Sequence, residues 1–264
     1  MRNLFKRIFS GIVYILIFIS AILFSKESYI VLIALFGFLC IWEFSKMAAL
    51  KNYAAYLFFP FLLFLLMKRQ ESFATTIVLI ITLLSSSSLI YQLFTNKEIK
   101  FTNERSKLGV TIRYLIFSMC FLILLPFYEN SFHPSLMIGI LSIIWVNDSF
   151  AFLIGKNFGK NKLFPSVSPK KTVEGLLGGL VFSLLAGLFI SKINLDFSLL
   201  NWLIIAVIVS LIGTKGDLVE SKFKRQANIK DSGNIMPGHG GILDRLDSLL
   251  FAAPFVYLYI NFII

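Results

Sequence analysis

Four of the aspartates in the second half of the chain stand in or near stretches rich in lysine and glycine. Asp244 and Asp247 are three positions apart, so on a helix they would share one face. Two like charges side by side repel unless one is protonated or a cation lies between them. Asp217 begins the same stretch and could lie close to this pair in the folded chain. The oxygen-rich set predicts a Mg²⁺ site, because Mg²⁺ keeps waters and substrate phosphates as its remaining ligands.

Asp148 is the fourth member of this set, and it stands inside an otherwise apolar run. An ionisable residue in such a run by default indicates function. The alternative is that Asp148 lies at a helix end and pairs with a lysine of the next loop. No cluster of Cys and His accompanies the four carboxylates, which argues against zinc.

A second group of residues could bind phosphate. The run Ser168-Pro169-Lys170-Lys171-Thr172 leads into a helix expected to start near Val173. Hydroxyls, lysines and free backbone N–H groups at a helix N-terminus make an anion site. The alternative is that Thr172 caps this helix, with Glu174 in its first turn, and both can hold together. The upstream segment Gly155–Lys160 does not have the spacing of a P-loop.

The elements that must position these residues are apolar. The 264 residues are 57% hydrophobic and 15% charged, whereas a soluble domain has about 45–50% and about 25%. A bilayer span needs about 20 mostly apolar residues. We therefore predict an all-α polytopic membrane protein with about nine spans, near residues 8–24, 28–47, 52–67, 74–95, 108–127, 134–154, 173–191, 197–213 and 247–263. The third is short, so eight spans remain an alternative.

The placement of positive charge predicts the orientation. If the N-terminus is cytoplasmic, only Lys26, Lys68, Arg69 and Lys192 of the 25 Lys and Arg residues fall in outside loops, and Arg113 falls within a span. This asymmetry is a clear positive-inside signal. The net charge of +11 is therefore interpreted as a cytoplasmic membrane face and not as a nucleic-acid site. The candidate site accordingly faces the cytoplasm.

The two halves of the chain differ in character. Residues 1–130 are apolar runs with short linkers, and the first of them is interpreted as a retained helix because no signal-peptide cleavage site follows it. Residues 131–264 are expected to form a second transmembrane region that carries the site, with cytoplasmic loops at 155–172 and 214–246. Loops of this length are usually functional. Cys40 and Cys120 fall inside predicted spans, so neither a disulfide framework nor a thiolate metal site is indicated.

One long pattern resembles the phosphatidate cytidylyltransferase (CDP-diacylglycerol synthase) family. The family pattern S-x-x-K-R-x-x-x-x-K-D, followed by P-G-H-G-G-x-x-D-R-x-D, stands here without a break between Ser221 and Asp247. The Asp148 segment and the run from Ser168 to Gly175 are also similar to the family. The motifs are confined to residues 145–250, and Phe150-Ala151-Phe152 departs from the Ala-Tyr pair common in the family.

The resemblance implies that CTP and phosphatidic acid react to CDP-diacylglycerol and pyrophosphate at a bacterial plasma membrane. It implies Asp217 and Asp244 as metal ligands, with Asp247 and Asp148 beside them, for Mg²⁺ and a second cation such as K⁺. The implied catalytic residues are Lys170, Lys171, Lys224, Arg225 and His239. The implied substrate-binding residues are Ser168, Thr172, Ser221, Lys230, Asp231, Gly240, Gly241 and Arg245. The resemblance leaves open whether the protein forms a homodimer.

Two alternatives remain at this stage. A related CTP-dependent lipid-alcohol kinase would share membrane helices and acidic ligands, but the full pattern up to Asp247 is not expected there. An ion-coupled transporter would use Asp148 to line an ion path. Transporters often consist of two similar halves with interrupted helices, and the halves of this chain differ.

Overall fold

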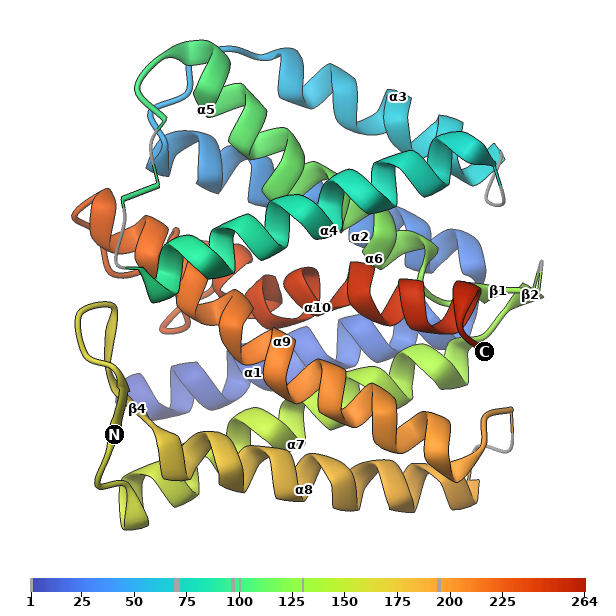
Figure 1. The fold of residues 1–264 in the computed structure, drawn as a ribbon, viewed down its shortest axis with the longest axis vertical. Coiled ribbons are helices and arrows are strands. Elements are labelled where there is room, and N and C mark those ends of the chain that lie inside the picture. Colours follow the sequence, from blue (N-terminus) through green and yellow to red (C-terminus); the bar gives the residue numbers. More distant parts are fainter. Residues whose placement is uncertain (1, 69–71, 96–97, 100, 130, 194–195) are drawn as a thin grey trace.

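The computed structural model describes residues 2–68, 72–95, 98–99, 101–129, 131–193 and 196–264, with side chains from Phe9 onward. Within these residues long helices pack side by side in one bundle (Figure 1). They are α1 Arg2–Phe24, α2 Lys26–Met47, α3 Ala54–Lys68, α4 Phe73–Phe94, α5 Glu104–Val110, η1 Thr111–Ile116, α6 Phe117–Leu124, α7 Pro134–Phe158, α8 Val173–Ile193, α9 Leu199–Gln226 and α10 Leu243–Phe262. The segments α5, η1 and α6 form one continuous rod in which η1 is π-helical. The predicted all-α class is confirmed.

Several of these helices could cross a bilayer. In the described part of the chain, six are long and apolar enough: α2, α4, the α5–η1–α6 rod, α7, α8 and α9. Phe9–Phe24 of α1 and all of α3 are shorter apolar helices. Large apolar side chains such as Leu16, Leu84 and Leu177 are exposed, as expected where helices contact lipid. The chain is a multi-pass membrane protein, while the count of nine spans stays a prediction.

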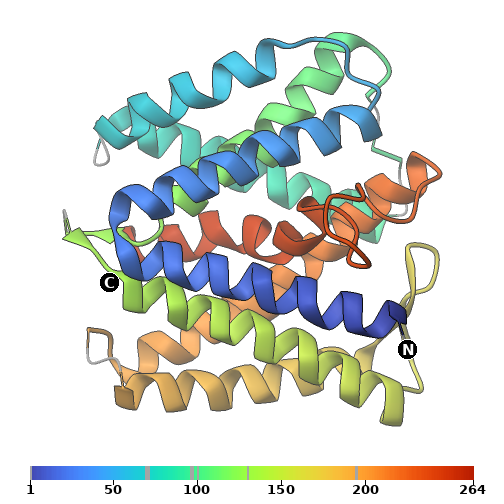
Figure 2. The same cartoon turned by 180° about the vertical axis from the view of Figure 1, so that it is seen from behind.

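The second half of the chain supplies four closely packed helices. α8 contacts α7 and α9, and α9 contacts α10 along much of its length. The approach of α8 to α7 depends on a missing side chain, because a methyl group at Gly179 would lie 3.0 Å from the carbonyl oxygen of Asn147. From the first half, α1 lies between α2 and α7 (Figure 2), and both α2 and α4 contact α10. Helices of both halves therefore surround α10.

Two short hairpins mark opposite ends of the bundle. β3 (Lys162–Phe164) pairs antiparallel with β4 (Ser168–Thr172), and β1 (Phe127–Tyr128) pairs with β2 (Ser131–Phe132). The β3–β4 hairpin lies at the end of the bundle that carries the N-terminus, and β1–β2 lies at the end that carries the C-terminus (Figure 1). The predicted loop at 155–172 is therefore partly wrong: α7 continues to Phe158 and the remainder is mostly this hairpin.

The predicted loop at 214–246 is too long. α9 continues to Gln226, and the connecting segment covers only 227–242. The reason is visible in the burial pattern, because Gly216, Glu220 and Phe223 recur at helical spacing and are buried. The charged residues near position 220 therefore belong to the packed face of a helix and do not mark its end.

Candidate active site

A cavity of about 650 Å³ opens where α7, α8, α9, α10 and the β3–β4 hairpin meet. Ten of the residues that the sequence singled out line it: Asp148, Lys170, Lys171, Thr172, Asp217, Lys224, Asp231, Asp244, Arg245 and Asp247. Acidic and basic side chains thus face one space, although they come from five separate elements. The cavity is the candidate active site.

Three carboxylates form a cluster in this cavity region. Asp217 and Glu220 of α9 and Asp247 of α10 each place a carboxylate oxygen within 4.8 Å of the others. Glu220 is fully buried, and its Oε1 has no hydrogen-bond donor among the described residues. Asp217 and Asp247 are half-buried, and three carboxylates this close together require neutralisation. The all-oxygen donor set fits a hard cation such as Mg²⁺.

Lysines compensate part of this negative charge. Lys171 of β4 forms an ion pair with Asp217, and Lys224 of α9 forms one with Glu220. Burial opposes the charge on Lys171, but the neighbouring Asp217 outweighs this effect and raises the pKa of Lys171 above its ordinary value. Lys171 is therefore protonated at neutral pH. Lys156, Lys162 and Lys170 also line the cavity and add positive charge.

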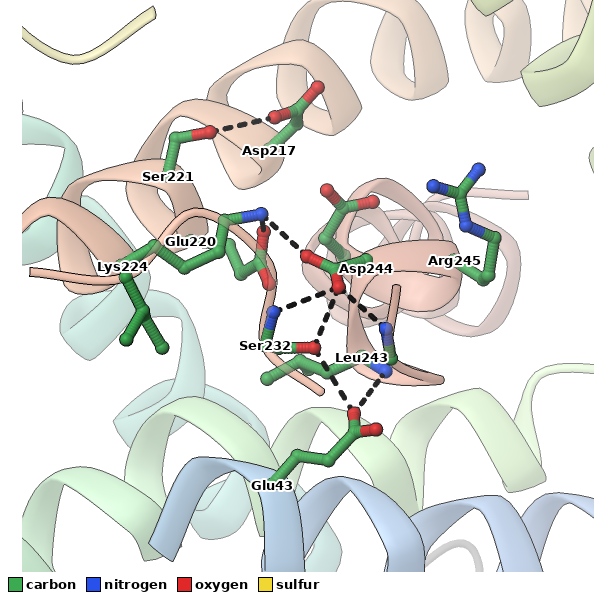
Figure 3. A network of polar contacts seen from close by, with 12 residues as sticks. Glu43, Asp217, Glu220, Ser221, Lys224, Ser232, Leu243, Asp244 and Arg245 are labelled. Carbon is green, nitrogen blue, oxygen red and sulfur yellow. Dashed lines mark hydrogen bonds and ion pairs between the residues drawn. The ribbon is translucent and has the colours of Figure 1, made fainter. Parts of the chain in front are cut away.

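Asp244 has a different environment from the other three predicted metal ligands. Its Oδ1 accepts from Lys224 Nζ at 2.7 Å. Its Oδ2 accepts from the backbone N–H of Ser232 at 2.9 Å, from the hydroxyl of the same residue at 2.9 Å and from the N–H of Gly241 at 2.7 Å (Figure 3). Both oxygens are thus occupied by donors of the chain, and Glu220 takes the third place in the cluster. A metal-binding role for Asp244 stays a prediction.

Asp148 of α7 and Thr172 of β4 also line the cavity. The carboxylate of Asp148 accepts from Asn147 Nδ2 at 3.3 Å. Thr172 is buried, and its Oγ1 accepts from the N–H of Gly175 at 3.1 Å, so the expected capping of α8 is present. Glu174 lies in the first turn of α8, as expected, and accepts from the backbone and side chain of Asn161, which holds the start of the hairpin.

Several other predicted residues do not line the cavity. Arg225 donates to the backbone oxygens of Val167 and Ile229, both at 3.3 Å, and so ties the hairpin to the end of α9. His239 Nδ1 lies 2.7 Å from the hydroxyl of Ser10 on α1. The catalytic roles of Arg225 and His239 stay predictions that the geometry does not support directly.

The remaining predicted binding residues also lie outside the lining of the cavity. Ser221 donates to Asp217 Oδ1 at 3.2 Å. Ser168 lies in β4, and Lys230 is exposed on the 227–242 segment. Gly240 has φ +87°, a conformation that residues with side chains rarely adopt, and it precedes the N–H of Gly241 that binds Asp244.

Comparison with known proteins agrees with this geometry. The sequence model of the cytidylyltransferase family matches residues 5–263. The chain belongs to this family. It is 34% identical to the phosphatidate cytidylyltransferase of Bacillus subtilis over 263 residues, 97% of each chain. It is 52% identical over 114 residues to the proteins of that name from Staphylococcus saprophyticus and Staphylococcus aureus strain COL, which is 42% of this chain and 44% of each relative.

Family membership confirms the resemblance drawn from the Ser221–Asp247 pattern. This cytidylyltransferase is a membrane-embedded nucleotidyltransferase. The transporter alternative loses its support, since the family is defined by group transfer. Group transfer to a phosphate depends on positioning and charge neutralisation, for which lysines and carboxylates are suitable groups.

Three polar residues of this cytidylyltransferase were missed by the sequence analysis. Glu220 stands one helical turn after Asp217 and shares its face, a signal that the predicted loop concealed. Asn147 is buried, and its Oδ1 accepts from Ser210 at 2.7 Å and from Ser183 at 3.3 Å, which joins α7, α8 and α9.

The third missed residue is Glu43, a buried carboxylate on α2. It stands between Trp42 and Phe44 in an apolar run, the same signal that singled out Asp148. The first half of the chain showed no chemical pattern around it, so its role depends on contacts that only the fold creates.

Proposed function

We propose that this chain is a phosphatidate cytidylyltransferase that transfers CMP from CTP to phosphatidate and releases pyrophosphate. The observation that carries the proposal is the cavity lined by Asp217, Asp247, Lys171 and Lys224. The buried carboxylate of Glu220 lies directly beside Asp217 and Asp247 and pairs with Lys224. The full-length similarity to the Bacillus subtilis protein supports the choice of substrates.

The reaction needs little covalent chemistry from the protein. A phosphate oxygen of phosphatidate attacks the α-phosphorus of CTP, a new P–O–P bond forms, and the bond to the β-phosphate breaks to release pyrophosphate. The attacking phosphate is already ionised at neutral pH, so no general base is required. The chain must bring two polyanions together and stabilise the charge that develops on the leaving group.

The charged residues in and beside the cavity divide this work. Asp217, Glu220 and Asp247 would hold Mg²⁺, which supplies charge neutralisation and a template for phosphate oxygens. Lys170 and Lys171 line the cavity and offer ammonium donors to phosphate oxygens. We also propose a second, monovalent cation such as K⁺, for which Asp148 is the candidate ligand. Asp231 and Arg245 line the same space and are proposed to contact substrate.

The location of the site is also proposed. The 227–242 segment and the β3–β4 hairpin lie at the bundle end that carries the N-terminus (Figure 1). The positive-inside asymmetry assigns this end to the cytoplasm, and the bacterial relatives point to a plasma membrane. CTP would then enter from the cytoplasm while phosphatidate arrives from the bilayer.

The test is a defined assay with purified protein in detergent, CTP labelled at the α-phosphate, Mg²⁺ and phosphatidic acid. Labelled CDP-diacylglycerol is expected, with loss of product in Asp217→Asn and Asp247→Asn. Asp196→Asn is the matched control, since Asp196 lies with Ser135 outside this cavity. A parallel reaction contains diacylglycerol and CTP labelled at the γ-phosphate. Absence of CDP-diacylglycerol would overturn the proposal. Formation of labelled phosphatidate in the parallel reaction would overturn it in favour of a lipid-alcohol kinase.

A further inference from the structure

Glu43 belongs to the first half of the chain but contacts the segment that carries the site. It lies on α2 and its side chain is fully buried. Oε1 accepts from the N–H of Ile242 at 3.1 Å, and Oε2 accepts from the N–H of Leu243 at 2.9 Å and contacts the hydroxyl of Ser232 at 3.2 Å. Figure 3 shows this carboxylate directed at the start of α10.

These contacts supply a helix cap from another helix. The first N–H groups of a helix have no partner within it, and a negative charge near them is stabilising. A side chain of the N-cap residue normally meets this need. The N-cap of α10 is Ile242, which has no side-chain cap hydrogen bond. Glu43 therefore takes over this role at α10.

The same carboxylate is linked to the charged cluster. The hydroxyl oxygen of Ser232 lies 2.9 Å from Asp244 Oδ2 and 3.2 Å from Glu43 Oε2. Asp244 in turn accepts from Lys224, which pairs with Glu220 of the cluster. A continuous series of polar contacts thus runs from α2 through the 227–242 segment to α9.

The fit around Glu43 leaves little freedom. A methyl group at Gly233 would lie 2.9 Å from Cδ of Glu43, and Gly241 packs on the same carboxylate. The backbone of the 227–242 segment therefore closes tightly around this side chain. Moving the carboxylate would move the start of α10, which carries Asp247.

We propose that Glu43 is a positioning residue for cytidylyl transfer. By holding Ser232, Ile242 and Leu243, it fixes the start of α10 and so the place of Asp247 relative to Asp217 and Glu220. It does not line the cavity, so it acts through these residues and not on the substrate. The kinetic part of this inference rests on the proposed function, whereas its structural part does not.

The kinetic test uses Glu43→Gln, which keeps the size but puts an NH₂ group against backbone donors. We expect kcat to fall by about 10–100-fold, the usual effect of losing a residue that orients metal ligands. The Mg²⁺ concentration for half-maximal activity should rise. The matched control is Tyr29→Phe, which removes another buried hydrogen bond of α2, from Tyr29 to the carbonyl of Leu122 at 2.6 Å. It should lower Tm and leave kcat and the Mg²⁺ dependence unchanged.

The structural test is hydrogen exchange of peptides covering 229–246, which requires no activity. Exchange should be faster in Glu43→Gln and unchanged in Tyr29→Phe. If Glu43→Gln does not fold, Ser232→Ala removes one partner of Glu43 and is expected to show the same effects more weakly. A lowered Tm with wild-type exchange, kcat and Mg²⁺ dependence would overturn the proposal. If no variant transfers CMP, the proposed function fails, while exchange still decides the role of Glu43.

A separate observation concerns Arg113, a cation within a helix that is long and apolar enough to span a membrane. It lies in η1, its side chain is exposed, and it has no ion-pair partner among the described residues. An arginine in such a segment is unfavourable without a counter-charge. π-Helical turns of this kind occur frequently at functional sites.

The surroundings of Arg113 form a groove of about 390 Å³ between α4 and the rod. Ser85, Ser88 and Gln92 of α4 line it together with apolar side chains such as Ile81. The guanidinium lies back over Gly109, where a methyl group would be 3.2 Å from an Nη atom. It is therefore directed along the helix towards Glu104, as expected of a side chain that reaches for the headgroup level.

We infer that this groove binds an anionic glycerophospholipid of the bilayer, apart from the catalytic cavity. Its phosphate would contact Arg113, because a guanidinium can donate two parallel hydrogen bonds to phosphate. The serine hydroxyls would contact the glycerol region, and the apolar side chains would contact the acyl chains.

Native mass spectrometry of the purified protein with phosphatidylglycerol or phosphatidylcholine tests this site without any activity. Arg113→Gln should lose one bound phosphatidylglycerol that Arg113→Lys largely retains. Lys68→Gln removes an exposed cation elsewhere, at the end of α3, and should bind as the wild type does. Equal phosphatidylglycerol binding by wild type and Arg113→Gln, or an equal loss of phosphatidylcholine, would overturn this inference.

Discussion

Asp217 on α9 and Asp247 on α10 place carboxylate oxygens within 4.8 Å of each other, although the segment 227–242 separates their helices in the sequence. Glu220 completes this cluster, and Lys171 and Lys224 each pair with one of its members. The excess of negative charge in the cluster is the basis of the proposed Mg²⁺ site, and the lysines around it are the proposed contacts for phosphate groups.

Glu220→Gln should abolish most of the transfer activity. A metal-bound charge contributes several kcal/mol, and each 1.36 kcal/mol is a tenfold change, so we expect a loss of about 100-fold or more. Asp244→Asn should give a smaller loss with a larger fall in Tm, since Asp244 is held by Lys224, Ser232 and Gly241. The measurement is activity against Mg²⁺ concentration, with Tm for each variant. The opposite ranking would make Asp244 the ligand.

Lys171→Gln should raise KM for CTP and lower kcat, together by about 10–100-fold, because it removes a charge from the cavity. Lys171→Arg should retain more activity. Lys46→Gln is the control, since Lys46 is exposed over Trp42 and outside the cavity. If Lys171→Gln has wild-type constants, the ion pair with Asp217 is structural only.

The charge of Lys171 should persist to high pH. Its folded pKa is raised by Asp217, so the stability that this pair contributes is present at neutral pH. It is lost only as pH rises through the folded pKa, above the ordinary value of 10.5. Tm of the wild type should therefore stay above Tm of Lys171→Gln throughout pH 6 to 9. A difference that vanishes within this range would contradict the assignment.

His239 should act together with Ser10 of α1. His239→Ala and Ser10→Ala should have similar effects and combine less than additively, with a coupling of about 0.5–3 kcal/mol, because the two side chains lie 2.7 Å apart. The measurement is a double-mutant cycle on Tm and on kcat/KM. A large loss of kcat in His239→Ala alone, with no effect of Ser10→Ala, would instead support the catalytic role predicted from the sequence.

The site should face the cytoplasm. A cysteine in Lys230→Cys reports on which side of the membrane the 227–242 segment lies. A cysteine in Glu129→Cys reports the same for the β1–β2 turn at the other end of the bundle. A membrane-impermeant thiol reagent should label Glu129→Cys in intact cells and Lys230→Cys only after permeabilisation. Background labelling should be low because Cys40 and Cys120 are buried. The reverse pattern would invert the proposed topology.

The sequence by itself determined the class of the protein and the region of its site. Apolar runs of spanning length need no tertiary information, since each helix satisfies its own backbone hydrogen bonds. The pattern from Ser221 to Asp247 also indicated the family, which the comparisons confirm. Most residues that line the cavity stood in the motifs identified from the sequence.

Only the tertiary structure decided which of these residues meet. From hydropathy alone, the helix was predicted to end before Asp217. In the structure α9 packs against α10 and extends to Gln226, and the side chain of Glu220 therefore lies in the carboxylate cluster. Glu43 contacts Leu243 across a separation of 200 positions. Such contacts depend on the rotation of each helix about its axis and on how the helices cross, which local patterns do not encode. The sequence therefore supplied the charged groups, and the packing of α2, α9 and α10 selected the partners of each carboxylate.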